Sequence, residues 1–173
     1  MGSMLISKHL IPGGDIMDCT MIGYRRAEVK DIEDLVRMRI QFIKEVQHVE
    51  GSDKDEALAE ELRKFFNATM PEDRFIAWLA EESGKIIGTS GLCFYSLAPS
   101  YKNMSGGVAY IQNMYTLPEH RGRGVAKVLF DKVLCEAKAL GYKKISLHAT
   151  EMGRPIYEKF GFTKVDNEMA LNL

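Results

Sequence analysis

The sequence lacks the cysteine and histidine spacings of a disulfide-stapled or metal-binding protein. Cys19, Cys93 and Cys135 are an odd number of cysteines and form no CxxC pair in a chain of 173 residues. The four histidines are scattered, and none of them stands at the short spacing that a zinc site requires. These absences argue against a disulfide framework and a resident metal. They favour a reducing compartment, so we expect a cytoplasmic protein.

The sequence also lacks a charge excess and a long apolar run. Lysine and arginine number 23 against 24 acidic residues, which gives a formal net charge of -1. A nucleic-acid-binding domain usually carries a clear basic excess, and this chain does not. We see no signal peptide and no apolar stretch long enough to cross a bilayer. We therefore expect neither a nucleic-acid partner nor a membrane partner.

What the chain does contain is enough apolar material for one core. Hydrophobic residues make up 46% of the sequence, and the length suits a single domain. Residues 1–20 differ from the rest, because they begin with a tag-like Met-Gly-Ser and are interrupted by Pro-Gly-Gly at residues 12–14. We expect residues 1–20 to be an extension that adds little to the fold, followed by one domain over residues 21–173.

Hydrophobic periodicity predicts a series of strands and helices. We expect strands at about 23–29, 75–81, 85–95, 108–116, 144–149 and 162–171, and helices at about 32–46, 53–70, 124–140 and 154–160. The order βααβββαβαβ predicts an α+β fold, an α/β sandwich. Its central sheet would be mixed and mostly antiparallel, with helices on both faces.

A glycine-rich turn precedes the third long helix. Residues 121–126 read Arg-Gly-Arg-Gly-Val-Ala. Glycine lets the backbone fold tightly, and the first N–H groups of a helix have no internal partner, so such a helix end binds phosphate. Arg121 and Arg123 add positive charge. The turn lacks the Gly-Lys-Ser/Thr of a Walker A loop, and Lys127 stands where a dinucleotide fingerprint has its third glycine.

Two segments resemble the GNAT superfamily of N-acetyltransferases. Residues 113–126 are similar to its acetyl-CoA motif, whose core pattern is Arg/Gln-x-x-Gly-x-Gly/Ala. That pattern is matched by Arg121, Gly124 and Ala126. Residues 156–162, Ile-Tyr-Glu-Lys-Phe-Gly-Phe, resemble the tyrosine-containing helix of the family and its exit into the last strand. The ordered pair is more specific than either motif alone, and the element order agrees over about residues 22–171.

The resemblance implies an enzyme that moves the acetyl group of acetyl-CoA to a primary amine by direct attack in a ternary complex. Acetyl-CoA would be a co-substrate, and no metal is implied. Its diphosphate would lie on the backbone amides of the turn and its pantetheine arm along the preceding strand, with an N–H near Met114 polarising the thioester carbonyl. The implied cofactor-binding residues are Asn113, Met114, Tyr115, Thr116, Arg121, Gly122, Arg123, Gly124, Val125, Ala126 and Tyr157.

The resemblance gives a general acid but leaves the general base open. Tyr157 matches the family's acid, because a phenol with an ordinary pKa of about 10 keeps its proton at neutral pH. The alternative interpretation of Tyr157 is a core tyrosine. Many relatives carry a glutamate on the strand where this chain has Gln112 and Asn113. His148 and Glu151 are the remaining candidates for the base, although His148 is equally explained as a hydrogen-bonded residue at a strand end.

The sequence does not identify the acceptor. We expect specificity to come from the first two helices and from the loop at 96–107. Acidic residues between positions 53 and 61 would either attract a cationic amine or form a solvated helix face. A small-molecule amine and a protein amine both remain open, and a homodimer is suggested only by family habit. Two rival functions are a non-catalytic acyl-CoA sensor and an unrelated binder of nucleotide phosphates.

Overall fold

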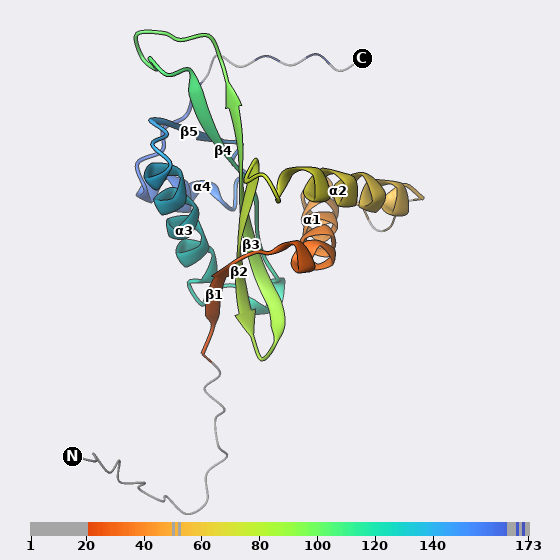
Figure 1. Cartoon of the computed structure of the whole chain (residues 1–173). Coiled ribbons are helices and arrows are strands. Elements are labelled where there is room, and N and C mark those ends of the chain that lie inside the picture. Colours follow the sequence, from red (N-terminus) through yellow and green to blue (C-terminus); the bar gives the residue numbers. More distant parts are fainter. Residues whose placement is uncertain (1–20, 50, 52, 166–168, 170, 172–173) are drawn as a thin grey trace, which may run out of the picture.

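The computed structural model describes residues 21–49, 51, 53–165, 169 and 171 (Figure 1). The elements are β1 (Gly23–Arg26), α1 (Ile32–Gln47), α2 (Asp55–Thr69), β2 (Phe75–Glu82), β3 (Lys85–Ser96), β4 (Gly107–Thr116), α3 (Val125–Ala139), β5 (Lys144–Leu147) and α4 (Arg154–Lys159). Short 3-10 turns at Val29–Asp31 and Pro118–His120 precede α1 and α3. The predicted order of elements is therefore confirmed as far as α4.

The two ends of the chain were predicted less well. The strand expected at 162–171 is not formed at residues 162–165, and most of the remainder of that range lies outside the described residues. The extension expected at residues 1–20 also lies outside them.

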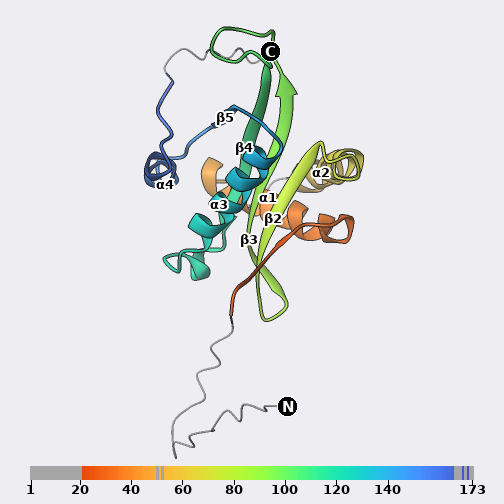
Figure 2. The ribbon, with the colours of Figure 1, turned by 60° about the vertical axis from the view of Figure 1, so that its left-hand side comes forward.

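A single sheet carries all the described strands in the order β1-β2-β3-β4-β5. The first three pairings are antiparallel, and β4 pairs with β5 in parallel. A parallel pair needs a crossover connection, which here is supplied by α3. Helices α1 and α2 cover one face of the sheet, while α3 and α4 lie on the other (Figures 1 and 2). The predicted fold, a mixed and mostly antiparallel sheet between helices, is confirmed.

An ion pair holds the start of α1 against β1. Asp31 is only 5% exposed. Its carboxylate accepts hydrogen bonds from Nη1 and Nη2 of Arg25 at 2.7 and 2.8 Å and from the backbone N–H of Glu28 at 2.7 Å. The hydrogen bond from Arg25 is the largest of the causes that hold the pKa of Asp31 below its ordinary value. The folded state therefore contains this group as an anion.

We expect Asp31→Asn to lower the free energy of unfolding at pH 7 by about 1–3 kcal/mol, because the amide loses the charged hydrogen bonds from Arg25. The folded pKa lies below the unfolded value of about 3.9, so the stabilisation is present above that pH and is lost as pH falls through the folded pKa. Urea unfolding of both proteins should show a difference that shrinks below about pH 4. A constant difference at every pH would contradict the role of the charge.

Candidate active site

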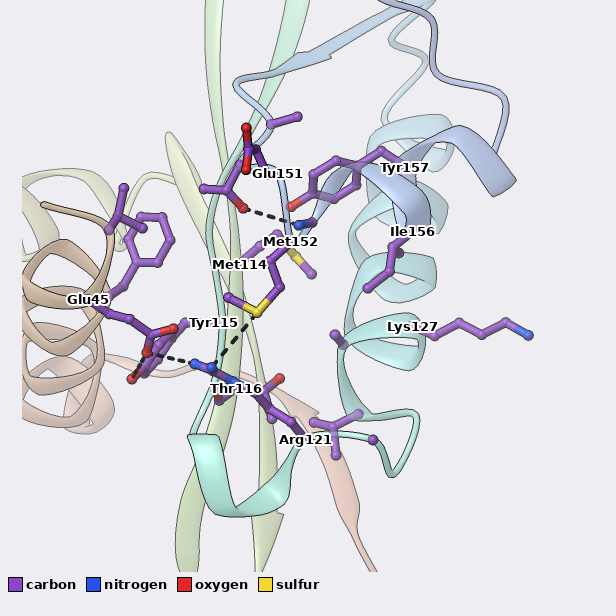
Figure 3. A pocket seen from close by; sticks show the side chains of 18 of the residues that line it. Glu45, Met114, Tyr115, Thr116, Arg121, Lys127, Glu151, Met152, Ile156 and Tyr157 are labelled. Atoms are coloured by element: carbon purple, nitrogen blue, oxygen red, sulfur yellow. Dashed lines mark hydrogen bonds and ion pairs between the residues drawn. The ribbon is translucent and has the colours of Figure 1, made fainter. Parts of the chain in front are cut away.

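A cavity of about 1120 Å³ opens beside the C-terminal half of β4. One wall is the C-terminal end of α1, and the opposite wall is formed by the start of α3, the loop after β5 and α4 (Figure 3). Its size suits a ligand at the upper end of the range for small-molecule pockets.

The floor of the cavity is the end of β4, beyond the point where β5 stops pairing with it. Strands β4 and β5 pair from Val108 and Lys144 to Ile111 and Leu147, where β5 ends, while β4 continues to Thr116. The two strands therefore separate after Ile111, and the later backbone groups of β4 on this edge have no partner among the described strands. The backbone N–H and C=O groups of such an edge can form hydrogen bonds with an extended ligand, in the same way that they would with an additional strand.

A bulge in β4 accompanies this separation. Asn113 has a left-handed φ of 55°, and the pairing of β4 with β3 shifts register between Thr89 and Gly91. A bulge changes the face on which the following side chains lie. Asn113 is consequently buried and does not line the cavity, whereas Met114 does.

The turn before α3 presents free backbone amides to the cavity. Gly122 and Gly124 have φ values of 75° and 81°, and no side chain caps the helix that follows. The first N–H groups of α3, at Val125, Ala126 and Lys127, therefore have no acceptor within the helix, and all three residues line the cavity. The first turn carries no acidic residue. This end of α3 has the donors and the dipole of an anion site.

Arg121 connects this turn to α1. Its Nη2 is 2.7 Å from Oε2 of Glu45, and its Nε donates to the carbonyl of Thr116 at 2.9 Å. The guanidinium also lies 5.6 Å from the ring centroid of Tyr115, whose hydroxyl donates to Glu45 at 3.2 Å. The hydrogen bond from Arg121 is the main reason why the pKa of Glu45 is lowered. Glu45 is therefore held as an anion and is a weak candidate for a base.

Arg123 is directed elsewhere. Its Nη1 and Nη2 donate to the carboxylate of Glu82, at the end of β2, at 2.9 and 2.6 Å. Its side chain is exposed and does not line the cavity. Two arginines that look equivalent in the sequence thus have different carboxylate partners.

Tyr157 lies on α4 at the cavity wall and is 8% exposed. Its ring packs against Phe130 and Phe162, with centroid distances of 5.0 and 6.4 Å, while its hydroxyl end faces the cavity (Figure 3). A Cβ at Gly153 would come within 3.0 Å of this hydroxyl, so the glycine leaves it room. Burial raises the pKa of Tyr157, which therefore keeps its proton at neutral pH. The ring is part of the core, and the hydroxyl is available to a ligand.

The two candidate bases lie in different places. Glu151 is exposed and lines the cavity on the loop after β5 (Figure 3). His148 does not line it, and its Nδ1 is 2.5 Å from the hydroxyl of Tyr110. The structure thus brings most of the predicted site residues to one cavity and leaves Asn113, Arg123 and His148 off its wall. Those on the wall are Met114, Tyr115, Thr116, Arg121, Gly122, Gly124, Val125, Ala126, Glu151 and Tyr157.

The wall formed by α1 was not predicted residue by residue. Phe42, Glu45, Val46 and His48 line the cavity, whereas no described residue of α2 or of the loop at 96–107 does so. The sequence did contain an indication of this wall. Glu45 is a charged residue beside the apolar stripe of an amphipathic helix, and such a residue needs a partner.

Among the described residues, no three histidine, cysteine or acidic side chains are grouped so that they could hold a metal ion. None of the described helices is both long enough and apolar enough to cross a membrane.

Comparisons with known proteins agree on one family. The family model described as acetyltransferase (GNAT) family matches residues 40–162. A crystal structure of a predicted acetyltransferase from Clostridium acetobutylicum, with acetyl-CoA, has a TM-score of 0.80 and 38% identity, covering 88% of this chain and 96% of that one. A GCN5-related N-acetyltransferase from Ralstonia eutropha also has a TM-score of 0.80, at 25% identity, covering 88% of this chain and 99% of that one.

Curated relatives match over a shorter region. A glucosamine 6-phosphate N-acetyltransferase from Trypanosoma brucei brucei is 31% identical over 94 residues, covering 54% of this chain and 61% of that protein. An uncharacterised N-acetyltransferase from Escherichia coli is 32% identical over 92 residues, covering 51% of this chain and 52% of that protein. The chain therefore spans between half and two thirds of the length of these curated relatives.

Proposed function

This chain belongs to the GNAT family of acetyltransferases, and from that premise we propose that it transfers the acetyl group of acetyl-CoA to a primary amine. The observation that carries the proposal is the cavity on which the free amides at the start of α3 and the free edge of β4 open together. A diphosphate needs free N–H donors such as those of α3, and an extended amide-containing arm needs a free strand edge such as that of β4. Acetyl-CoA needs the two surfaces side by side. The relative from Clostridium acetobutylicum, whose structure is with acetyl-CoA, supports this choice of co-substrate.

The residues present fit such a co-substrate. The amides of Gly124 and Ala126, with the positive end of the α3 dipole, suit the diphosphate. The edge of β4 at residues 112–116 suits the pantetheine amides. Thr116 also contributes a buried Oγ1 that has no hydrogen-bond partner among the described residues. Arg121 acts in this arrangement by fixing the turn to α1 rather than by free contact with phosphate.

The chemistry follows from groups that face the cavity, with His148, just before the cavity-lining loop, as one of two candidate bases. Acetyl-CoA supplies an acyl group activated as a thioester. The amine nitrogen bonds to the acyl carbon as the carbon–sulfur bond breaks, and the amine loses a proton while the sulfur gains one. Tyr157 donates the proton to sulfur, and the backbone N–H of Met114 polarises the carbonyl. His148 or Glu151 accepts the amine proton, directly or through a water molecule. Holding both reactants in line supplies much of the rate.

The release of free CoA thiol from acetyl-CoA, measured with a panel of amines, tests this function. We expect at least one amine to be acetylated and CoA to bind in a separate calorimetric titration. Binding without turnover of any amine would favour the acyl-CoA sensor. Displacement of CoA by ATP, or a folded protein that binds no CoA, would overturn the proposal in favour of another phosphate ligand.

A further inference from the structure

Arg39 stands in the apolar stripe of α1. The residues of this helix that pack into the core include Ile32, Leu35, Val36, Met38 and Phe42. Arg39 lies three residues after Val36 and three before Phe42, where the pattern calls for an apolar residue. Its guanidinium is therefore placed beneath the helix rather than on the solvent face.

No carboxylate in the described part of the chain neutralises this guanidinium. It stacks 5.4 Å from the ring centroid of Phe42, and the ionisable groups that act on its pKa are Tyr110 and Cys93, neither of which is a carboxylate. Burial is the largest of these influences and lowers the pKa of Arg39. Within the described part of the chain, no ion pair or hydrogen bond of Arg39 is found. An unpaired half-buried charge is costly, and a guanidinium without a counter-ion among the described residues is suited to bind the anionic group of a ligand.

Other arginines of the molecule do not share this situation. Arg25 pairs with Asp31, Arg37 with Asp34, Arg63 with Glu33, Arg121 with Glu45 and Arg123 with Glu82. The difference between Arg37 and Arg39 is informative, because they stand two residues apart on the same helix. Arg37 is exposed and paired, whereas Arg39 is half-buried and has no counter-ion among the residues that the structure describes.

The surroundings of Arg39 are polar and adjoin the cavity. Cys93 and Tyr110 are cross-strand partners on β3 and β4, and Gln112 donates to the Sγ of Cys93. Tyr110 contacts His148, the residue before the cavity-lining loop, and Phe42 itself lines the cavity. A ligand that enters from the cavity under α1 can therefore meet the guanidinium of Arg39 close to a candidate base.

We propose that Arg39 binds an oxyanion, a carboxylate or a phosphate, that the acceptor carries in addition to its amine. The proposal rests on acetyl transfer as the function of the cavity. Arginine matches both oxyanions through two parallel N–H donors. Such an acceptor neutralises a charge that has no counter-ion among the described residues, whereas a polycationic acceptor would be repelled from the same place. The acceptor is therefore a small amine with an acidic group.

Matched pairs of acceptors test this inference. One pair is glucosamine 6-phosphate against glucosamine, and the other is an α-amino acid against its primary amide. We expect the anionic member of at least one pair to have a kcat/KM at least about tenfold higher. In Arg39→Met this advantage should fall by roughly 10- to 100-fold, the range for a lost hydrogen bond to a charged group. The KM for acetyl-CoA should not change, and Arg39→Lys should restore part of the advantage.

Arg37→Met is the matched control, because it removes an arginine from the exposed side of the same helix. We expect this variant to keep the preference for the anionic acceptor. Arg39→Met should unfold at the same or a higher denaturant concentration than the wild type, because methionine suits the apolar stripe better than an unpaired charge. A merely structural role for Arg39 would instead make this variant less stable.

The possible outcomes separate this inference from the proposed function. If neutral amines are acetylated as well as anionic ones, and Arg39→Met changes neither, the inference is wrong and acetyl transfer stands. If no amine is acetylated, the function is wrong, and equilibrium binding of the same pairs in the presence of CoA tests Arg39 separately. Tighter binding of the anionic member by the wild type than by Arg39→Met would support the oxyanion site. Equal binding would overturn it. The pair that responds distinguishes phosphate from carboxylate.

Discussion

Replacing Tyr157 by phenylalanine is expected to lower kcat for acetyl transfer by about 100- to 10,000-fold, the range that a positioned general acid contributes. The substitution removes only the hydroxyl oxygen, which faces the cavity, and keeps the ring that packs against Phe130 and Phe162. We therefore expect the KM for acetyl-CoA and the unfolding midpoint to change little. Steady-state release of CoA thiol measures the loss, and thermal unfolding checks the fold.

The pH dependence of kcat gives a second readout for Tyr157. Burial raises the pKa of this phenol above its ordinary value of about 10, so the wild type keeps the proton through the neutral range. The contribution of the acid is complete below the raised pKa and is lost as pH rises through it. Where chemistry limits turnover, the wild-type rate should decline on this alkaline side, and Tyr157→Phe should lack that alkaline decline.

Tyr142→Phe is the control for both readouts. Tyr142 stacks on Phe94 at 4.8 Å, packs against the same core cluster as Tyr157, and lies outside the cavity wall. Loss of its hydroxyl should leave kcat within about twofold of the wild type, as for a surface or core change away from the site. If Tyr157→Phe also keeps nearly all the activity, Tyr157 is a core tyrosine and the acid lies elsewhere.

Features that depend on local sequence were predictable. The strands and helices as far as α4 follow from hydrophobic period and from Gly and Pro punctuation. The turn before α3 was found because a left-handed residue at a helix start favours glycine, and Gly124 has that conformation. A family resemblance placed these local signals in one order, and the comparisons confirm the family.

Features that depend on distant partners were not predictable. Glu45 and Arg121 are 76 positions apart, and nothing local in either segment indicates their contact. Asn113 was expected at the cofactor because it lies on the strand that the resemblance assigns to the pantetheine arm, and the structure places it in the bulge of β4, buried and off the cavity wall. Strand alternation cannot reveal such a bulge, since one extra residue changes the face of every side chain that follows.

The charge of Arg39 can be interpreted only when its position in the sequence is combined with its surroundings in the structure. Read alone, an arginine within an apolar helical stripe is an irregularity in the pattern. With Glu45 already paired to Arg121, the described part of α1 contributes one satisfied charge and one unsatisfied charge to the region of the cavity. The satisfied charge fixes the architecture of the site. The unsatisfied charge is the better guide to what the site binds.

Gly124→Asp is expected to weaken CoA binding strongly while Gly124→Asn does so only slightly. Asn and Asp both tolerate the left-handed conformation that Gly124 adopts, with φ of 81°, so their backbone strain is matched. A Cβ at this position meets no atom within 4 Å, so neither side chain is obstructed. The pair therefore differs mainly by one negative charge at the end of α3 that faces the cavity.

The added carboxylate should have opposite effects on the free and the bound protein. In the free protein a negative charge at a helix N-terminus is stabilising, so Gly124→Asp should be more stable than Gly124→Asn by about 0.3–1 kcal/mol. In the complex the same carboxylate repels the diphosphate. Unit charges 4 Å apart interact by about 4 kcal/mol at an effective dielectric of 20. Greater separation and screening reduce this to about 2 kcal/mol, a roughly 30-fold weaker affinity.

Calorimetric titration of CoA at low and high salt, together with urea unfolding of the free variants, measures both effects. The affinity gap between the two variants should narrow as salt screens the repulsion. Equal affinities for CoA, with the Asp variant still the more stable free protein, would show that the charge is present at the helix end but that no diphosphate lies there. That result would remove the basis for placing acetyl-CoA in this cavity, because the free amides at the start of α3 would then serve no ligand phosphate.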